Sequence, residues 1–193
     1  MGAPLSFHAL TIKHNGLVPR IISPTVISPA YDPAHPPTLT PLERTVDALW
    51  DTGATGSVIT ATTANALNLS PIGSVTMNTA GGTRLALTYL INMLLPNRVH
   101  LVGVQVSECP DNAGQFGAII GMDIIARGDL AITNTNGHTW LSFRIPSVEA
   151  VDFVQQANRL TYAGVQRNAP CPCGKRRDNG QPVKFKHCHG TMA

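Results

Sequence analysis

"ALWDTGATGSVIT", residues 48–60, is the most informative segment of the sequence. It opens with apolar residues typical of a buried strand, places the carboxylate of Asp51 where that strand ends, and continues into Thr52-Gly53. A simple Asx turn would explain this triplet on its own, because Asp, Thr and Gly are common turn residues. This position presents the acid rather than burying it in a core, and on the triplet alone the Asx turn is the favoured explanation.

The composition predicts a mainly β protein. The chain has 193 residues, of which 43% are hydrophobic, enough for the core of one domain with an appendage. Its 17 glycines and 15 prolines favour strands joined by turns. Residues 1–166 carry eight Lys/Arg and ten Asp/Glu, whereas residues 167–193 carry six and one. The basic character of the protein therefore belongs to its tail.

Neither a membrane span nor a secretory leader is predicted. The most apolar region, residues 85–96, is interrupted by Asn92 and ends at Pro96, short of the roughly 18 apolar residues that a span needs. The start of the chain lacks a charged leader followed by a continuous apolar segment. We therefore expect a cytoplasmic protein with no membrane partner.

Hydrophobic periodicity and turn residues predict strands with one or two short helices. A hairpin is expected at Asn15-Gly16, between strands over 5–12 and 17–28. Five prolines make residues 29–41 an exposed loop, and Thr60 is expected to cap a helix over 60–69. The remaining predicted elements are strands at 44–50, 73–79, 84–95, 99–108 and 117–121, a short helix or turn near 122–128, and a last hairpin around Asn136-Gly137.

Three segments, in this order, resemble the retroviral-type branch of the aspartic peptidases. "ALWDTGATGSVIT" resembles the active-site segment of that family. "TAGGT", residues 79–83, stands where the branch carries its glycine-rich flap, and "GAIIGMDII", residues 117–125, resembles the segment that crosses behind the catalytic loop. The resemblance covers roughly residues 5–146 and implies a closed retropepsin-like β-barrel.

The resemblance also implies a chemistry. Hydrolysis by this route needs two carboxylates that share a proton, because two like charges a few ångströms apart do not both ionise cheaply. This chain has one Asp-Thr-Gly turn and is too short for two lobes, so a second Asp51 would come from a second subunit. By resemblance, Thr52 would bridge the two turns and Gly53 would allow close packing. The flap, which would bind the substrate, would comprise Ala80, Gly81, Gly82 and Thr83.

Two other acids and two departures from the family pattern bear on this assignment. Asp123 and Asp129 are rival acids, for which a role as helix cap or turn acid is favoured. The proline-rich stretch 29–41 is longer than a minimal retroviral enzyme needs, and the flap lacks the apolar tip often found in that branch. Both departures leave substrate access and specificity open.

Three of the four cysteines gather in the tail. Cys171, Cys173 and Cys188, with His189, supply three thiolates and one imidazole, which is the ligand set of a closed tetrahedral zinc site. The alternatives to zinc are a disulfide with a spare thiol, which is disfavoured in a chain without a secretory leader, and a disordered basic tail. Cys109 stands apart and is expected to be a free core or loop thiol.

The stretch "RNAPCPCGKRRDNGQPVKFKHCHG", residues 167–190, resembles the SEC-C zinc module found at the end of the bacterial preprotein translocase ATPase. The segment between the Cys171/Cys173 pair and Cys188 is longer than is usual for this module, and residues 176–183 look like an insertion. His187 therefore competes with His189 as the fourth ligand. The resemblance implies docking to a protein or the ribosome. Basic residues there could also hold RNA phosphates, but Phe185 is their only aromatic neighbour, so docking is favoured.

These inferences predict a retropepsin-like domain over 1–147, a helical linker over 148–166 and a zinc-binding tail over 167–193. The apolar stripe of the linker comprises Val148, Val151, Phe153, Val154 and Leu160. We expect a homodimeric aspartic endopeptidase acting on polypeptides, with structural Zn²⁺ in the tail and no cofactor for catalysis. The alternative is a non-catalytic dimeric adaptor that binds a peptide or protein and docks through its zinc module to a protein, the ribosome or RNA. The intact Asp-Thr-Gly-Ala sequence favours the enzyme.

Overall fold

The computed structural model describes residues 8–79, 82–111 and 115–191. The chain forms two compact units, Met1–Val148 and Glu149–Ala193. Ala80 and Gly81 of the predicted flap lie outside the described residues.

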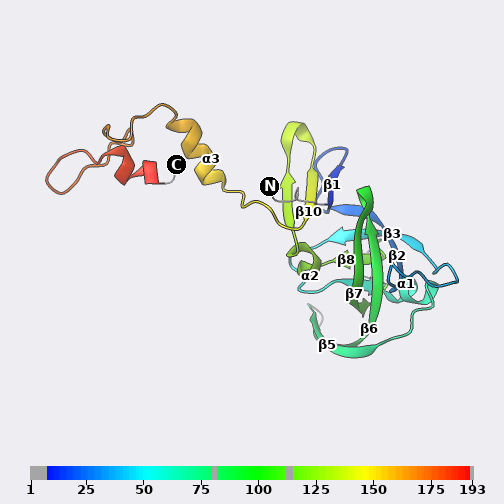
Figure 1. Cartoon of the computed structure of the whole chain (residues 1–193). Helices are drawn as coiled ribbons and strands as arrows, with labels where there is room; N and C mark the ends of the chain where they lie inside the picture. Colours follow the sequence, from blue (N-terminus) through cyan, green and yellow to red (C-terminus); the bar gives the residue numbers. More distant parts are fainter. Residues whose placement is uncertain (1–7, 80–81, 112–114, 192–193) are drawn as a thin grey trace. The chain divides into compact units, whose positions relative to one another are not determined.

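The first unit is built around a closed six-stranded β-barrel (Figure 1). Its strands follow the order β2-β3-β8-β4-β7-β6, and pairing of β6 with β2 closes the barrel. β5 pairs only with β6, so the two form a hairpin that extends the sheet. This architecture confirms the predicted mainly β, closed-barrel fold. The strands are β2 (Ile22–Pro29), β3 (Arg44–Trp50), β4 (Val58–Thr60), β5 (Gly73–Thr79), β6 (Gly82–Leu95), β7 (Val99–Cys109) and β8 (Ala118–Ile120).

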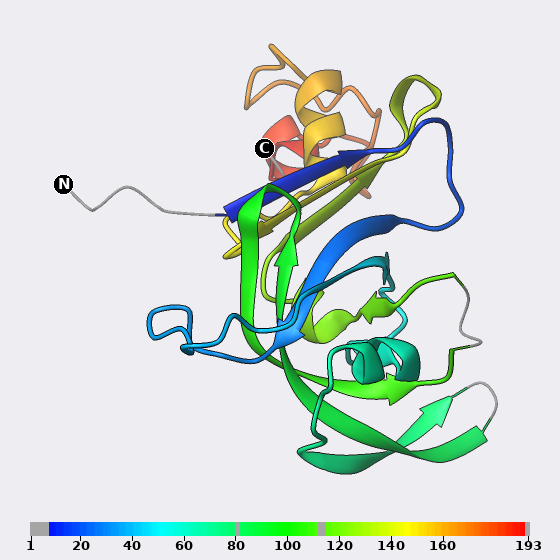
Figure 2. The same ribbon diagram turned by 90° about the vertical axis from the view of Figure 1, so that its right-hand side faces the viewer.

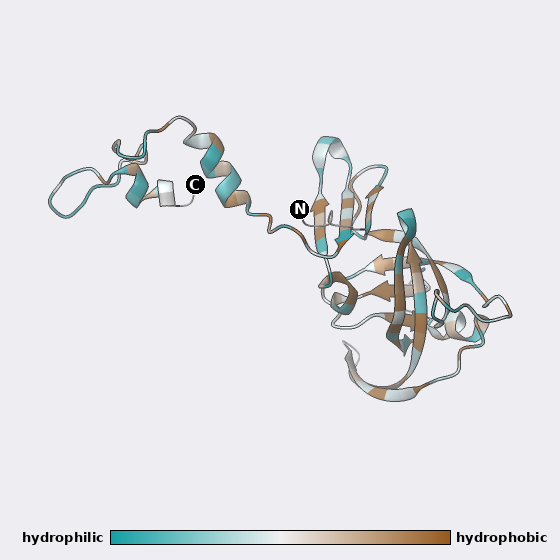
Figure 3. Ribbon diagram, in the orientation of Figure 1, coloured by the Kyte–Doolittle hydropathy of each residue, from teal (hydrophilic) through white to brown (hydrophobic). Residues whose placement is uncertain are grey.

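The barrel closes around an apolar core. Successive side chains of a strand point to opposite faces, and in each barrel strand one set turns inward. The inward set is rich in β-branched residues, which pack well on a pleated surface. Figure 3 shows hydrophobic colouring along much of the barrel strands. Fully buried examples from five of the six strands are Ile27, Ala48, Ile59, Ile91 and Ile120.

A smaller antiparallel sheet, of order β1-β10-β9, completes the first unit (Figure 2). It comprises β1 (His8–Lys13), β9 (Asp129–Thr133) and β10 (Trp140–Ile145). The β9–β10 hairpin confirms the predicted turn, in which Asn136 and Gly137 both have positive φ, at 53° and 74°.

The predicted hairpin at Asn15-Gly16 is wrong, because β1 pairs with β10 rather than with β2. The chain does turn at Gly16, which has φ 99°. However, the Gly16 carbonyl accepts from Thr139 N (3.0 Å) and His14 N donates to the Thr139 carbonyl (2.8 Å). These bonds to a distant strand replace the local pairing, and the chain then crosses to the barrel.

The described residues of the first unit include the short helices α1 (Ala61–Ala66) and α2 (Met122–Ile125). Thr60 caps α1 as predicted, since its Oγ1 accepts from Thr63 N at 3.2 Å. Leu67, directly after α1, is buried in the core. A 3₁₀ turn, η1 (Pro96–Arg98), joins β6 to β7, and η2 (Thr135–Gly137) joins β9 to β10.

The second unit contains α3 (Phe153–Thr161) and two 3₁₀ turns, η3 (Phe185–His187) and η4 (His189–Thr191). α3 is shorter than the predicted helical stretch 148–166, because Asp152 already caps it by accepting from Gln155 N at 2.9 Å. In the part of the chain that the structure describes, no helix is long and apolar enough to cross a membrane.

Candidate active site and candidate metal centre

The loop that carries Asp51 connects two strands that flank β8. β3 runs parallel to β8, with Trp50 opposite Ile120, and β4 runs antiparallel to it, with Val58 opposite Ile119. The chain therefore leaves β3 on one side of β8 and returns in β4 on the other side. This arrangement places residues 51–57 across the end of β8.

Backbone hydrogen bonds fasten this loop to the segment that follows β8. Asp51 N donates to the Ile120 carbonyl at 3.0 Å, and Met122 N donates to the Ala54 carbonyl at 2.8 Å. The loop is therefore held at its start, Asp51, and in its middle, Ala54, by residues on either side of Gly121. Both bonds join backbone groups, so they do not depend on side-chain identity.

Ser57 adds a side-chain connection that the sequence did not indicate. Its buried hydroxyl donates to Asp123 Oδ1 at 2.7 Å and accepts from Gly121 N at 3.0 Å. Ser57 and Asp123 thus join the end of the Asp51 loop to the first turn of α2. In the sequence, Ser57 is simply a serine six residues after Asp51. Serine is too common for its presence there to predict this contact.

Gly121 is required by the close approach of the loop. A Cβ atom built on it would lie 2.6 Å from the Gly56 carbonyl carbon and 3.0 Å from the Ala54 carbonyl oxygen. These are backbone atoms, which cannot rotate away as a flexible side chain can.

We therefore expect Gly121→Ala to lower the free energy of unfolding by roughly 1–3 kcal/mol through overpacking. Urea denaturation monitored by tryptophan fluorescence measures the change. Gly56→Ala is the matched control, because a Cβ at Gly56 meets no atom within 4 Å and its φ is not in the left-handed region. Equal urea midpoints for the two variants would contradict this account of the loop.

The Asp51 carboxylate is half-buried and largely unengaged. Its Oδ1 accepts from Gly53 N at 2.8 Å, and within the described ranges the carboxylate makes no other hydrogen bond or ion pair. A Cβ at Gly53 would lie 3.2 Å from the same Oδ1, which explains the glycine. Thr52 and Gly53 are both exposed. The turn thus presents an acid with free lone pairs to whatever approaches it.

The strand before Asp51 is anchored by Trp50. Its Nε1 donates to Ser23 Oγ at 2.9 Å, and its ring meets Phe143 edge-on with centroids 5.1 Å apart. The first contact ties β3 to the neighbouring β2, and the second ties it to the β1-β10-β9 sheet. The acid therefore follows a rigid strand.

The two rival acids are engaged in structural contacts. Asp123 accepts from Ser57, as described above. Asp129 pairs with Arg144 Nε at 2.7 Å and also accepts from Val148 N at 2.9 Å and from the Ser147 hydroxyl. Asp129 therefore ties β9 to β10 and to the chain that leaves the barrel.

The predicted flap falls on the β5–β6 hairpin. Thr79 pairs with Gly82, and Gly82 has φ 108°, a conformation that favours glycine. At the base of the hairpin, the Tyr89 hydroxyl donates to Glu108 Oε2 at 2.7 Å. Burial and this bond raise the pKa of Tyr89 to about 12, so it stays a neutral donor that ties β6 to β7.

The predicted metal ligands come together in the second unit. The Sγ atoms of Cys171, Cys173 and Cys188 and a ring nitrogen of His189 all lie within 4.8 Å of one another. Neighbouring donors are closer: Cys171 Sγ lies 3.4 Å from Cys173 Sγ and 3.3 Å from His189 Nδ1. His187 is not in the cluster.

This donor set fits a tetrahedral metal ion. With Zn–S bonds of about 2.3 Å and Zn–N bonds of about 2.0 Å, tetrahedral geometry separates donor atoms by roughly 3.5–3.8 Å. The Cys173 and Cys188 sulfurs, 3.7 Å apart, and Cys188 Sγ and His189 Nδ1, 3.4 Å apart, are close to these values. The cluster could therefore hold a metal ion of the zinc type.

Short backbone contacts build the frame of this cluster. Gly174, with φ 75°, turns the chain after the first cysteine pair, and its N donates to the Cys171 carbonyl at 3.1 Å. The segment 176–183, interpreted as an insertion, forms a small hairpin in which Arg177 N donates to the Gln181 carbonyl at 2.8 Å.

Tyr162 is a member of the frame to which the sequence assigned no role. Its ring lies 4.7 Å from the His189 ring and 5.5 Å from the Phe185 ring, between centroids. Tyr162 directly follows α3, so its ring contacts link the end of this helix to the Cys/His cluster within the second unit. Tyr162 lies nine residues before Cys171 in the sequence, and this spacing does not indicate the contact with His189. The contact depends on how the tail folds.

Comparison with known proteins gives one family match and one match to a curated protein. Residues 42–127 match the family model described as gag-polyprotein putative aspartyl protease. A 45-residue stretch, 23% of this chain, is 49% identical to the protein translocase subunit SecA of Granulibacter bethesdensis, of which it spans 4%.

Two solved structures are also similar. The retropepsin-like aspartic protease of Rickettsia conorii aligns with a TM-score of 0.46 and 10% identity, over 75% of this chain and 99% of that one. A Legionella pneumophila protein of unknown function aligns with a TM-score of 0.29 and 18% identity, over 42% of this chain and 74% of that one.

The fold and the family match together define the first unit. A closed β-barrel carries an exposed Asp-Thr-Gly turn, and the segment from 42 to 127 that contains this turn matches the aspartyl protease family. The first unit thus has the closed-barrel fold of a retropepsin-like aspartic peptidase domain, and its residues 42–127 match the model of that family. The Cys/His cluster of the second unit, together with the translocase match, fits a SEC-C module.

Proposed function

We propose that the protein is an aspartic endopeptidase whose site forms between two copies of the chain, each contributing Asp51, Thr52 and Gly53. The observation that carries the proposal is the Asp51 carboxylate, which lies on a fastened loop and keeps free lone pairs. A turn that served the fold alone would have no need of an acid with so few contacts.

The requirement for a second copy follows from the chemistry. Each chain offers one Asp-Thr-Gly turn, and the two rival acids are engaged, Asp123 by Ser57 and Asp129 by Arg144. Thr52 and Gly53 are exposed, so the turn is accessible to an identical turn of a second copy. Two carboxylates brought together in this way share one proton, because the ionisation of one disfavours that of the other.

The two acids then have complementary roles. The ionised Asp51 accepts a proton from a water molecule as the water oxygen attacks the carbonyl carbon of the peptide bond. The protonated Asp51 of the second copy donates its proton to the carbonyl oxygen. The tetrahedral intermediate collapses when the proton held by the first Asp51 passes to the leaving nitrogen and the C–N bond breaks. As the C=O bond re-forms, the Asp51 of the second copy takes back the proton from the former carbonyl oxygen, so one acid is again ionised and the other protonated. No cofactor takes part in these steps.

The β5–β6 hairpin is proposed to cover the substrate. Gly82 and Thr83, with Ala80 and Gly81 before them, would form its substrate-binding tip. A glycine-rich tip costs little to rearrange, since glycine adopts conformations that other residues avoid.

The second unit is proposed to recruit the peptidase domain to its targets. Cys171, Cys173, Cys188 and His189 would hold a structural Zn²⁺, which fixes the hairpin that carries exposed Arg176 and Arg177. Such a basic surface suits a protein or ribosomal partner in the cytoplasm, where thiols stay reduced. The translocase match supports this role.

Endoproteolysis of an unfolded polypeptide tests the proposal. We expect the purified protein to cut such a substrate between pH 4 and 7, with fragments identified by mass spectrometry, and we expect chelators to leave the cleavage of small peptides unchanged. Absence of cleavage by a dimeric preparation across this range would contradict the proposal and favour the alternative, a dimeric binding adaptor.

A further inference from the structure

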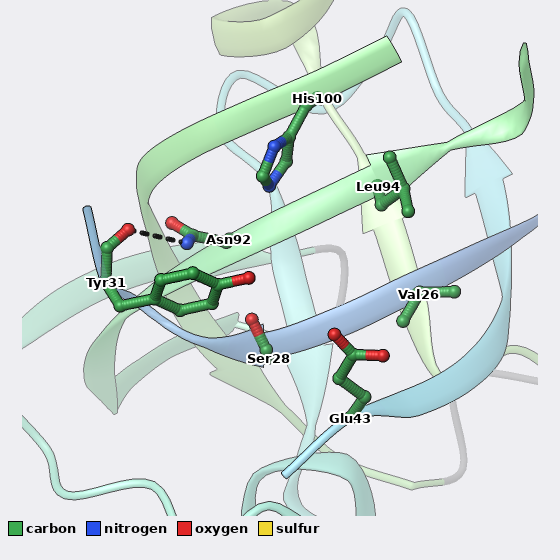
Figure 4. A pocket seen from close by; sticks show the side chains of 7 residues that line it. All are labelled: Val26, Ser28, Tyr31, Glu43, Asn92, Leu94 and His100. Atoms are coloured by element: carbon green, nitrogen blue, oxygen red, sulfur yellow. Dashed lines mark hydrogen bonds between the residues drawn. The ribbon is translucent and has the colours of Figure 1, made fainter. Parts of the chain in front are cut away.

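A small pocket lies on the outer wall of the barrel (Figure 4). Its volume is about 70 Å³, and it is lined by Val26 and Ser28 of β2, Leu94 of β6 and the residues discussed below. The strand neighbours of these residues, Ile27 and Met93, are buried in the core. Since side chains alternate along a strand, the pocket faces away from the barrel interior.

The pocket is remote from Asp51. Glu43 lines it and stands just before β3, whereas Asp51 follows the other end of the same strand. Eight residues of extended chain at about 3.3 Å each separate the two acids by roughly 25 Å. The pocket adjoins the proline-rich stretch 29–41, which also supplies Tyr31 and for which the peptidase chemistry has no use.

Three polar side chains point into this space without an intramolecular partner. The Glu43 carboxylate, the Tyr31 hydroxyl and the His100 ring make no hydrogen bond or ion pair with any residue in the described ranges. Figure 4 shows all three turned toward the same small volume. Convergent polar groups in a preformed pocket are typical of a ligand site.

Asn92 holds one wall of the pocket in place. It is 2% exposed, donates from Nδ2 to the Tyr31 carbonyl at 2.8 Å and accepts from Gly103 N at 2.9 Å. The first bond fixes the start of the proline-rich stretch against β6, so Tyr31 is positioned before any ligand arrives. Preorganisation of this kind lowers the entropic cost of binding.

The lining has the chemistry of an ammonium acceptor. Glu43 supplies a negative charge, and oxygen lone pairs come from the Tyr31 hydroxyl and from Ser28, whose own proton goes to the Pro29 carbonyl at 3.1 Å. An ammonium group carries three donors and no acceptor, which matches these oxygens. Val26 and Leu94 provide the apolar surface along which a methylene chain packs.

We propose that this pocket binds the ammonium group of a lysine side chain presented by a polypeptide. A guanidinium group is planar and prefers a bidentate carboxylate, whereas the oxygens here come from three separate residues and suit a compact point charge. A polypeptide bound in this way would be held about 25 Å from Asp51 along β3. The inference concerns binding alone and does not rest on peptidase activity.

NMR titration of the full zinc-loaded chain tests the proposal through the ring signals of Tyr31 and His100. The probe is Nα-acetyl-lysine methylamide at pH 7.5, and the neutral comparison with a similar stem is Nα-acetyl-norleucine methylamide. We expect saturable shifts with the lysine compound and at least about tenfold weaker binding of the norleucine compound, since one charge-assisted hydrogen bond accounts for such a factor.

Variants assign the effect to the pocket. Glu43→Gln is expected to weaken binding of the lysine compound at least about tenfold, whereas Asp47→Asn, which removes an exposed charge from the adjoining strand β3, should change it less than about twofold. Equal binding of the norleucine compound, no effect of Glu43→Gln, or tighter binding of a third probe, Nα-acetyl-arginine methylamide, would overturn the proposal. Tighter binding of n-butylamine would overturn the assignment to a lysine side chain in favour of a free alkylamine.

Discussion

Asp51→Asn is expected to lower kcat/KM for peptide hydrolysis by at least about a thousandfold, because one general acid or base contributes roughly 10²–10⁴ and both copies lose theirs. The amide of Asn is neither a base for water nor an acid for the carbonyl oxygen. Its Oδ1 can still accept from Gly53 N, which is the single hydrogen bond of the Asp51 side chain among the described residues, so the turn should persist. Steady-state kinetics with a fluorogenic peptide measure the change.

Two controls separate chemistry from folding in this experiment. Asp47→Asn makes the same replacement at an exposed side chain of β3, the strand that precedes Asp51, and is expected to keep kcat/KM within about twofold. The Asp51→Asn variant should also keep the urea midpoint of the wild type within error. Retention of more than a tenth of the wild-type kcat/KM by a folded Asp51→Asn dimer would remove Asp51 from the reaction.

Removal of the metal is expected to unfold the second unit and leave the barrel folded. Only three apolar residues of the described part of this unit are buried, namely Cys171, Val183 and Phe185, and one of them is a proposed ligand. So small a core does not offset the entropy of ordering about 45 residues, whereas structural zinc binding supplies roughly 10–16 kcal/mol. Amide signals of residues 162–191 should collapse to unfolded positions after chelation, while those of 8–148 stay dispersed.

Ligand variants test the same site by metal analysis. Cys171→Ser is expected to lose the bound metal ion, and His187→Gln should retain it, because His187 lies outside the cluster. Unchanged metal content in Cys171→Ser, or a second unit whose signals stay dispersed after chelation, would contradict the proposed centre.

Features that depend on neighbouring residues could be predicted from the sequence. The Thr60 cap and the Asn136-Gly137 hairpin follow from bonds within a few residues, and both were confirmed. The closed barrel and the position of the Asp51 turn were predicted from the Asp-Thr-Gly motif, because this motif resembles that of a family whose fold is known.

Features that depend on distant contacts could not be predicted. β1 pairs with β10, more than a hundred residues away, and this pairing prevails over the local turn signal at Gly16. The packing of Gly121 on Gly56 and of Tyr162 on His189 appears only when the chain is folded. The lysine pocket is of the same kind, because it brings Tyr31, Glu43 and His100 together from three parts of the sequence.

Mixing wild-type and Asp51→Asn chains at a constant total concentration tests the central claim most directly. If one active site needs Asp51 from two copies, activity should fall as the square of the wild-type fraction, so an equal mixture retains about a quarter of the activity. If each chain acts alone, the same mixture retains about half. A quarter is the result that a shared site predicts, and a linear decline to one half would contradict it.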